Sequence, residues 1–219
     1  MRIIKVNATN STNEFARELY RGKTSFEPIC VVAQEQTKGR GQRGSGWVSN
    51  AGENLTFSVL YPKIKVGVNH QFLMSATVSL AIIEVLNKFN VPALNVKWPN
   101  DIMSARYKIS GILIENILKN NEIAASIIGV GLNVNQTEFP GLPQASSLKL
   151  VTGNNFNLDE LLKRITHEFE DKLTQINADT ESIILEKYAR NMFRRDLVST
   201  FKLPDDTYLT GIIRGVTTS

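Results

Sequence analysis

A glycine-rich stretch at residues 39–47, Gly-Arg-Gly-Gln-Arg-Gly-Ser-Gly-Trp, constrains the fold of this chain more than any other segment. Its glycines match the Gly-x-Gly-x-x-Gly fingerprint of dinucleotide-binding folds. That fingerprint requires a strand before it, a helix directly after it and an acidic residue about 20 positions further on. The apolar run 28–36 supplies the strand, but no helical apolar stripe follows Gly44, and 54–61 alternates like a second strand. The stretch therefore predicts a long loop between two strands and argues against a dinucleotide-binding unit.

Two arginines, Arg40 and Arg43, are interleaved with the glycines of this loop. Glycines leave backbone N–H groups accessible, and guanidinium groups donate several hydrogen bonds to an anion. The loop lacks the Gly-Lys-Ser/Thr end of a P-loop, and no His-Arg-Asp sequence of a protein kinase follows it. We therefore expect an anion-binding loop of another kind, with a mobile surface loop as the alternative.

Composition narrows the class of protein. The 219 residues are enough for one sizeable domain and a small appendage. A net charge of +4 without a long basic run does not imply bulk nucleic-acid binding, and it fits an anionic substrate or an acidic protein partner. Cys30 is the single cysteine, so an intrachain disulfide is excluded and a reducing compartment is suggested. The sequence has only two histidines, His70 and His167, and these with one cysteine cannot form a zinc site of the usual kind. No apolar run approaches about 18 residues and the N-terminus has no apolar segment, so we expect a cytoplasmic protein.

The spacing of apolar residues predicts both strands and helices. Strands are expected at 2–6, 28–36, 54–61, 109–118 and 123–132, with a hairpin turn at 119–122. Helices are expected from a capping box at Ser11 and Glu14 to Gly22, and then at 70–90, 158–176 and 179–192. Turns or connections are expected at 62–68 and 137–157.

The end of the chain returns to a β pattern, with apolar segments at 200–203 and 208–216 around a turn. Two or three strands do not bury a core alone. We therefore expect residues 1–192 to form the main domain. Residues 193–219 are expected to be the start of a small β-domain, either truncated or completed by docking.

Three polar clusters interrupt the apolar pattern. In 97–101, Lys-Trp-Pro-Asn-Asp places three polar side chains around a proline turn. In 107–111, Lys108 begins an otherwise apolar strand. In 129–135, two glycines allow close approach to a strand that ends in two asparagines. Structural turns and a bulge are the alternative interpretation of these clusters.

No strong nucleophile accompanies these clusters, because there is no Gly-x-Ser-x-Gly sequence and Cys30 has no histidine partner in sequence. Cationic donors recur instead: Arg40, Arg43, Lys97 and Lys108. Cations, glycines and amides suit phosphoryl or nucleotidyl chemistry, where catalysis consists mainly of positioning and charge stabilisation.

Five segments occur in the order typical of one known family: 11–13, 35–47, 97–101, 108–115 and 129–135. Together they resemble the biotin protein ligases, or biotin–[acetyl-CoA-carboxylase] ligases, over about residues 1–192. The tail resembles the start of that family's small SH3-like domain. The resemblance implies an α+β fold in which a mixed, mainly antiparallel sheet packs with helices.

The resemblance implies a two-step reaction. Biotin and ATP, the latter as its Mg²⁺ complex, form biotinyl-5′-AMP with release of pyrophosphate. Biotin then passes to one lysine of a biotin carboxyl carrier protein or domain of acetyl-CoA carboxylase or a related carboxylase. No tightly bound cofactor, DNA or membrane is implied, and a ligase without a DNA-binding domain is expected because the sequence starts at the catalytic domain. An edge strand could pair two subunits as a homodimer or receive the carrier domain, and both alternatives stay open.

Matching motifs also imply site residues. Biotin is expected to contact Ser11, Thr12, Asn13, Gln36, Gly39, Arg40, Gly111 and Gly131. ATP or the adenylate is expected to contact Arg40, Gln42, Arg43, Trp47, Lys97, Asn100, Lys108 and Asn133. Lys108 and Arg40 are the expected catalytic cations, and Asp101 is expected to orient or deprotonate the acceptor lysine. Mg²⁺ is expected at the phosphates, with Asn100 or Asp101 as candidate contacts.

The loop departs from the family pattern at two positions. Gln42 stands where an arginine is usual, five residues before Trp47, and Ser45 stands where a second arginine is usual. Because the first of these helps to retain the adenylate, we expect weaker retention unless Arg43 substitutes. Two alternative functions stay open: a lipoate or octanoate ligase of the same fold, and a non-enzymatic module that senses biotin or a nucleotide or binds nucleic acid weakly.

Overall fold

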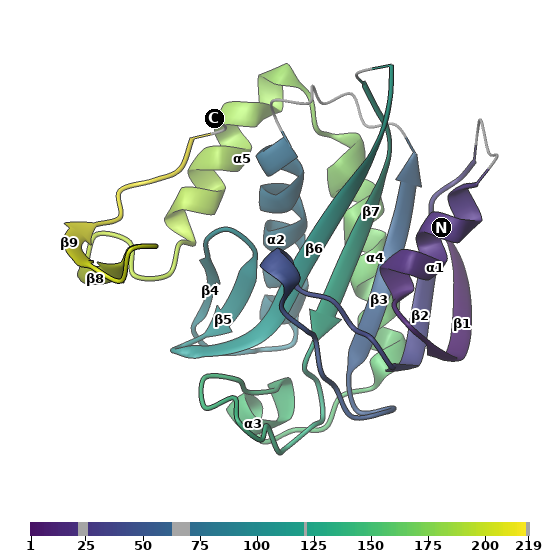
Figure 1. Cartoon of the computed structure of the whole chain (residues 1–219), viewed down its shortest axis with the longest axis horizontal. Helices are drawn as coiled ribbons and strands as arrows, with labels where there is room; N and C mark the ends of the chain where they lie inside the picture. Colours follow the sequence, from purple (N-terminus) through teal and green to yellow (C-terminus); the bar gives the residue numbers. More distant parts are fainter. Residues whose placement is uncertain (22–25, 63–70, 121, 218–219) are drawn as a thin grey trace.

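The computed structural model of the chain describes residues 1–21, 26–62, 71–120 and 122–217. A seven-stranded sheet forms its centre (Figure 1). Its spatial order is β1 (Arg2–Thr9), β2 (Ile29–Gln36), β3 (Leu55–Pro62), β7 (Glu122–Leu132), β6 (Tyr107–Lys119), β5 (Asp101–Ser104) and β4 (Leu94–Lys97). Only β1 and β2 pair in parallel; the other five pairings are antiparallel. The mixed, mainly antiparallel sheet predicted from the sequence is therefore confirmed.

Helices cover both faces of this sheet. The short α1 (Thr12–Tyr20) connects the parallel strands and packs through Ala16 on Leu60 and Ile127. The helices α2 (Gln71–Lys88), α4 (Leu158–Thr174) and α5 (Ala178–Arg190) contribute to the large core on the opposite face. The strand β3 is buried along almost its whole length because alternate residues face these two cores. A short α3 (Leu148–Thr152) follows β7.

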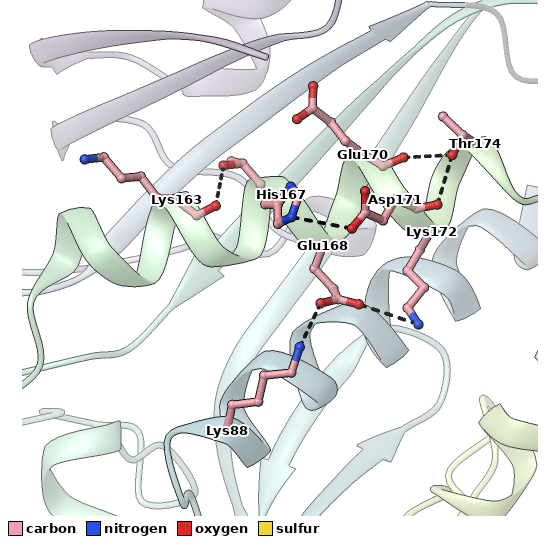
Figure 2. A network of polar contacts seen from close by, with 9 residues as sticks. Lys88, Lys163, His167, Glu168, Glu170, Asp171, Lys172 and Thr174 are labelled. Atoms are coloured by element: carbon pink, nitrogen blue, oxygen red, sulfur yellow. Dashed lines mark hydrogen bonds and ion pairs between the residues drawn. The ribbon is translucent and has the colours of Figure 1, made fainter.

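Ion pairs join two of the helices on the large-core side. The Glu168 carboxylate of α4 accepts from Lys88 Nζ of α2 at 3.1 Å and lies 3.5 Å from Lys172 Nζ, so that it stands between two cations (Figure 2). Lys172 also reaches Glu84 of α2 at 2.8 Å. These ion pairs join α4 to α2 at the surface, and apolar contacts join the same two helices in the large core.

Most predicted elements are present, with several corrections. Ser11 precedes α1 as its N-cap, but its side chain makes no capping hydrogen bond, so the predicted capping box is wrong. The first strand extends to Thr9 rather than ending near residue 6, and α4 ends at Thr174. The strand β5 and the helix α3, which lies inside the expected connection 137–157, were not predicted. Gly22, His70, most of the turn expected at 62–68, and one residue of the expected hairpin turn lie outside the described residues.

The end of the chain contains a separate two-stranded antiparallel sheet, formed by β8 (Val198–Lys202) and β9 (Tyr208–Ile212). It is consistent with the beginning of an SH3-like part. The domain boundary near residue 192, the truncation and the homodimer remain predictions. Within the described residues, no helix combines the length and the apolar character needed to cross a membrane.

Candidate active site

A cavity of about 220 Å³ lies on the α1 side of the sheet. It is bounded by the N-terminus of α1, the glycine-rich loop and the strands β5, β6 and β7. The site residues predicted from the sequence that line it are Ser11, Thr12, Asn13, Gln36, Arg40, Gln42, Trp47, Asn100, Asp101, Lys108, Gly111 and Gly131. Residues more than 100 positions apart are thus brought together at one place.

The floor of this cavity contains two glycines that are cross-strand partners, Gly111 on β6 and Gly131 on β7. The Trp47 indole fills the space that side chains would otherwise occupy there. A Cβ added to Gly131 would lie 2.2 Å from Cε2 of Trp47, and one added to Gly111 would lie 3.2 Å from its Cζ3. Nε1 of Trp47 is buried and has no hydrogen-bond partner among the described residues. The glycines therefore form a platform for the indole.

Backbone contacts within the loop bring Trp47 to this platform. The Trp47 N–H donates to the Gly39 carbonyl at 3.0 Å, and the Gly41 N–H donates to the Ser45 carbonyl at 2.7 Å. A Cβ at Gly39 would lie only 2.3 Å from the carbonyl oxygen of Trp47. Gly39 is therefore needed for the close approach of the two ends of the loop. The loop also contains one 3₁₀ turn, at Gln42–Gly44.

A lysine stands at the edge of the platform. Lys108 Nζ lies 2.7 Å from Oδ1 of Asp101 and 5.7 Å from the centre of the Trp47 ring. Its end is 3.3 Å from the position of a Cβ on Gly111, so the missing side chain leaves room for the ammonium group. The ammonium is therefore held by a carboxylate and an aromatic face, and part of it stays accessible.

The wall formed by α1 is polar. Gln36 Oε1 accepts from the backbone N–H of Thr12 at 2.8 Å and from the Thr12 hydroxyl at 3.0 Å. Asn13 lies against Gly129, where an added Cβ would be 2.3 Å from Asn13 Oδ1. The close approach predicted for the glycines of 129–135 is thus made at Gly129 by Asn13. Nothing in the sequence indicated Ser58 of β3, whose hydroxyl contacts both Thr12 and Asn13.

A second cavity, of about 450 Å³, adjoins the first. Trp47, Asp101 and Lys108 line both cavities and form their shared boundary. The second cavity is also lined by Lys97, by Asn133 and by residues of the segment 139–145. Sequence reasoning assigned this segment only to a connection, and its composition gives no signal of a role in the site.

Local hydrogen bonds position the second wall. The Lys108 N–H donates to the Gln144 carbonyl at 2.7 Å, and the Ser146 N–H donates to the Lys108 carbonyl at 3.0 Å. The Asn133 side chain donates to the Ser146 carbonyl at 2.9 Å. The segment before α3 is thereby attached to the strand that carries the ammonium group.

The turn between β4 and β5 is fixed from two sides. The Asn100 side chain donates to the Ile112 carbonyl at 2.8 Å. The Pro99 carbonyl accepts from Ser75 at 3.2 Å and from Tyr188 at 3.4 Å. Burial and the nearby Asp101 carboxylate raise the pKa of the Tyr188 hydroxyl well above its usual range, so Tyr188 stays neutral. This turn determines where Asp101 stands.

Two predicted residues line neither cavity: Gly39, which acts through the loop backbone, and Arg43. Arg43 has a left-handed backbone (φ 53°) and is exposed, whereas its neighbour Gln42 lines the first cavity. Within the described part of the chain, no three histidine, cysteine, aspartate or glutamate side chains are grouped so as to hold a metal.

Comparison with known proteins gives the family. Residues 6–133, more than half of the chain, match the model of the biotin/lipoate A/B protein ligase family. The chain belongs to that family. The bifunctional ligase/repressor BirA of Salmonella typhimurium is 34% identical over 125 residues, 57% of this chain and 38% of that protein. The biotin–[acetyl-CoA-carboxylase] ligase of Mycobacterium tuberculosis is 27% identical over 96% of this chain and 78% of its own length.

Solved structures agree with this membership at the level of the fold. The biotin protein ligase from Aquifex aeolicus in complex with biotin and ATP superposes with a TM-score of 0.80 at 24% identity. The match covers 99% of this chain and 88% of that one. The chain spans about two fifths of the length of the first curated relatives that it matches.

Proposed function

We propose that this protein is an ATP-dependent biotin protein ligase, which forms biotinyl-5′-AMP and transfers biotin to a lysine of a carrier protein or domain of acetyl-CoA carboxylase or a related carboxylase. One observation carries the proposal: two cavities share a boundary at which a lysine, an aspartate and a tryptophan meet. A two-part ligand such as an acyl-adenylate needs two adjoining sites with a cation at the junction. The membership of the family supports the same conclusion.

Biotin fits the first cavity by its chemistry. Its ring has a urea with N–H donors and a carbonyl acceptor, and its chain is apolar. The wall from Ser11 to Asn13, with Gln36, offers polar partners at one end, and the Trp47 indole that lies on the glycine platform offers a flat apolar surface. The carboxylate of the chain would then point to Lys108.

Adenylate formation needs no protein base, because a carboxylate is already ionised at neutral pH. It needs cations that offset the repulsion between the carboxylate and the triphosphate. Lys108 would stabilise the charge that develops on the α-phosphate, and Arg40 at the mouth of the first cavity would add a second cation. Mg²⁺ would enter with ATP as part of the substrate. The second cavity would receive the nucleotide, with Lys97 and Asn133 in its wall.

Transfer needs a neutral amine on the acceptor lysine. Asp101 lines both cavities and is partly exposed, so an amine that approaches the mixed anhydride would meet its carboxylate. We assign to Asp101 the orientation and deprotonation of this amine, which then attacks the acyl carbon and releases AMP as the leaving group. Gln42 lines the first cavity without a charge, so we expect weaker retention of the adenylate than an arginine at this position would give.

The test of the proposal is pyrophosphate release from biotin and MgATP. The wild-type protein should release pyrophosphate and accumulate biotinyl-5′-AMP. Lys108→Ala should lower the rate by about 10²–10³, as for loss of one charge-stabilising donor. Lys163→Ala, an exposed lysine of α4 on the other side of the sheet, serves as the matched control and should leave the rate unchanged. Absence of adenylate from the wild-type reaction would contradict the enzymatic function.

A lipoate or octanoate ligase is the second candidate, because the family includes lipoate ligases. Thermal shift separates the two: a ligand present at 100 times its Kd should stabilise the protein by about 2.7 kcal/mol. Stabilisation by biotin and not by lipoate is expected, since the α1 wall offers partners to a urea. Stabilisation without turnover would support a sensing module. A cytoplasmic location is part of the proposal and is supported by the single, buried Cys30.

A further inference from the structure

A row of polar contacts runs from the protein surface to the wall of the first cavity. Nη2 of Arg17 on α1 lies 3.2 Å from Oε1 of Glu115 on β6. The other oxygen of Glu115 accepts from Nδ2 of Asn13 at 2.8 Å. Oδ1 of Asn13 in turn lies 2.6 Å from Oγ of Ser58. Arg17, Glu115 and Ser58 do not line the cavity, so they act on it only through Asn13 and Thr12.

Glu115 determines which way the Asn13 amide faces. An ionised carboxylate only accepts hydrogen bonds, so it selects the N–H₂ end of the amide. The Leu113 carbonyl, also an acceptor, lies 3.4 Å from the same nitrogen. The carbonyl end of Asn13 is thereby directed to Ser58 and to the space above Gly129, where a Cβ would come within 2.3 Å of it. The asparagine, which is 4% exposed, presents an acceptor on the cavity side.

Beside Asn13, the hydroxyl groups have fewer protons to donate than there are hydrogen-bond contacts among the oxygen atoms. Three close oxygen–oxygen contacts join Thr12 to Gln36 (3.0 Å), Thr12 to Ser58 (2.7 Å) and Ser58 to Asn13 (2.6 Å). Threonine and serine together bring only two hydroxyl protons to these three contacts. The wall therefore has more acceptors than donors, and the carboxylate behind it adds to the negative potential. Such a wall favours a ligand that presents N–H groups.

We propose that Glu115, held by Arg17, is a positioning residue that makes the first cavity selective for a cyclic urea over rings or chains without N–H donors. The proposal rests on biotin as the substrate. Glu115 touches no reacting atom, and its effect is on the affinity for the ring end of the ligand. It acts by keeping the Asn13 carbonyl, and the hydroxyl groups next to it, available as acceptors.

The decisive variant is Glu115→Gln, which keeps the size and removes the charge. A glutamine offers either a donor or an acceptor to Asn13, so the amide is no longer held in one orientation. We expect about a tenfold increase in the Kd for biotin, which corresponds to the loss of roughly 1.4 kcal/mol. The KM for ATP and the kcat at saturating biotin should change by less than about twofold, because the lost interaction is the same in the ground state and the transition state.

Isothermal titration with biotin and with octanoate, together with pyrophosphate-release kinetics, tests the proposal. The selectivity for biotin over octanoate should fall in Glu115→Gln and, less strongly, in Arg17→Ala, with recovery in Arg17→Lys. Glu18→Gln and Arg21→Ala are matched controls: Glu18 is an exposed residue of α1 and Arg21 directly follows the helix. Arg17 is at the surface, so its replacement should not disturb the fold. If Glu115→Gln does not fold, Arg17→Ala still tests the proposal.

The outcomes distinguish this role from a structural one and from the proposed function. Equal losses of biotin and ATP affinity, together with a lower melting temperature of the ligand-free protein, would show that Glu115 merely supports the fold. An unchanged Kd for biotin in Glu115→Gln would overturn the selectivity role while leaving the ligase function intact. A wild-type protein that binds no biotin would overturn both.

Discussion

Adding a single methyl group at Gly131 tests the role of the glycine platform. In Gly131→Ala the new Cβ would lie 2.2 Å from Cε2 of Trp47, whereas ordinary contacts begin at 3.4 Å. The indole must therefore move by at least 1.2 Å, since the neighbouring atoms of the strand are fixed by the β6–β7 pairing. The shift also changes the position of the ring relative to Lys108 Nζ, which lies 5.7 Å from its centre.

The expected size of the effect follows from this displacement. A misplacement of about 1 Å near the reacting groups costs on the order of 10²-fold in rate. Loss of the contact between Lys108 and the ring adds about 0.5–1 kcal/mol. Pyrophosphate release should thus fall on the order of 10²-fold from the misplacement, and about two- to fivefold more where the contact with Lys108 is lost. Gly111→Ala, whose Cβ meets the ring at 3.2 Å, should have a much smaller effect.

The assay is pyrophosphate release with saturating MgATP, measured beside tryptophan emission of the ligand-free protein. The emission of Gly131→Ala should shift toward that of an exposed indole, since Trp98, the other tryptophan, is already half exposed and contributes a constant signal. Gly215→Ala is the control, because a Cβ there meets no atom within 4 Å.

A double-mutant cycle decides whether the clash with Trp47 is the cause. In a Trp47→Ala background there is no ring to displace, so Gly131→Ala should cost less than about 0.5 kcal/mol further in activation free energy. A penalty of the same size with and without the ring would contradict the platform role. A full rate for Gly131→Ala in the wild-type background would contradict it as well.

Further results are expected for three residues. Asp101→Asn should slow transfer to the carrier lysine by about 10²-fold or more while adenylate formation persists, as quenched-flow separation of the two steps would reveal; equal loss in both steps would remove Asp101 from its role. Burial raises the pKa of the Cys30 thiol from 9.0 to about 12, so a thiol reagent should label it only after unfolding. Between these two pKa values the thiol is ionised in the unfolded chain and neutral in the folded one. Burial of the neutral thiol therefore contributes fully to the free energy of unfolding below pH 9, and this contribution is lost as the pH rises toward 12. Urea titrations at several pH values would detect the loss. Glu168→Ala removes the carboxylate between Lys88 and Lys172 (Figure 2) and should lower the free energy of unfolding by about 1 kcal/mol, less in high salt.

Periodic apolar segments were the most predictable part of the fold. The strands β2, β3, β6 and β7 and the helices α2, α4 and α5 were all expected from their spacing, because burial of one or two faces leaves a clear pattern. The four-residue strand β5 is too short to show such a pattern, and it forms because β4 and β6 pair with it on both sides.

The capping box at Ser11 shows where local rules failed. Ser11 has the extended backbone of an N-cap residue, but its side chain faces the cavity. The N–H of Thr12, the first residue of the helix, donates to Gln36, which is 24 residues away. A partner at that distance leaves no signal in a short sequence window, so this tertiary contact at the start of the helix was not predictable from local capping rules.

The candidate site was predictable in its members and not in its arrangement. Motif order brought out Lys108, Asp101 and Trp47, but no pattern predicted that the indole lies on the Gly111–Gly131 pair or that 139–145 forms a wall. These contacts depend on the loop closing over strands that come much later in the chain. The role of Arg43 as a substitute for the missing arginine stays a prediction, and in the described conformation Gln42 occupies the cavity wall.

In the proposed reaction, the short contact between Lys108 and Asp101 would set an order of events. A carboxylate that already has an ammonium at 2.7 Å exerts little attraction on a second one, so an acceptor lysine gains little by arriving early. A phosphate at the junction would compete for the same ammonium, and once paired with Lys108 it would leave the Asp101 carboxylate without its counter-ion. The Lys108 ammonium would then couple the two half-reactions. With such coupling, Asp101 would attract the acceptor lysine only after the acyl group has been activated, and no movement of a whole domain would be needed to enforce that order.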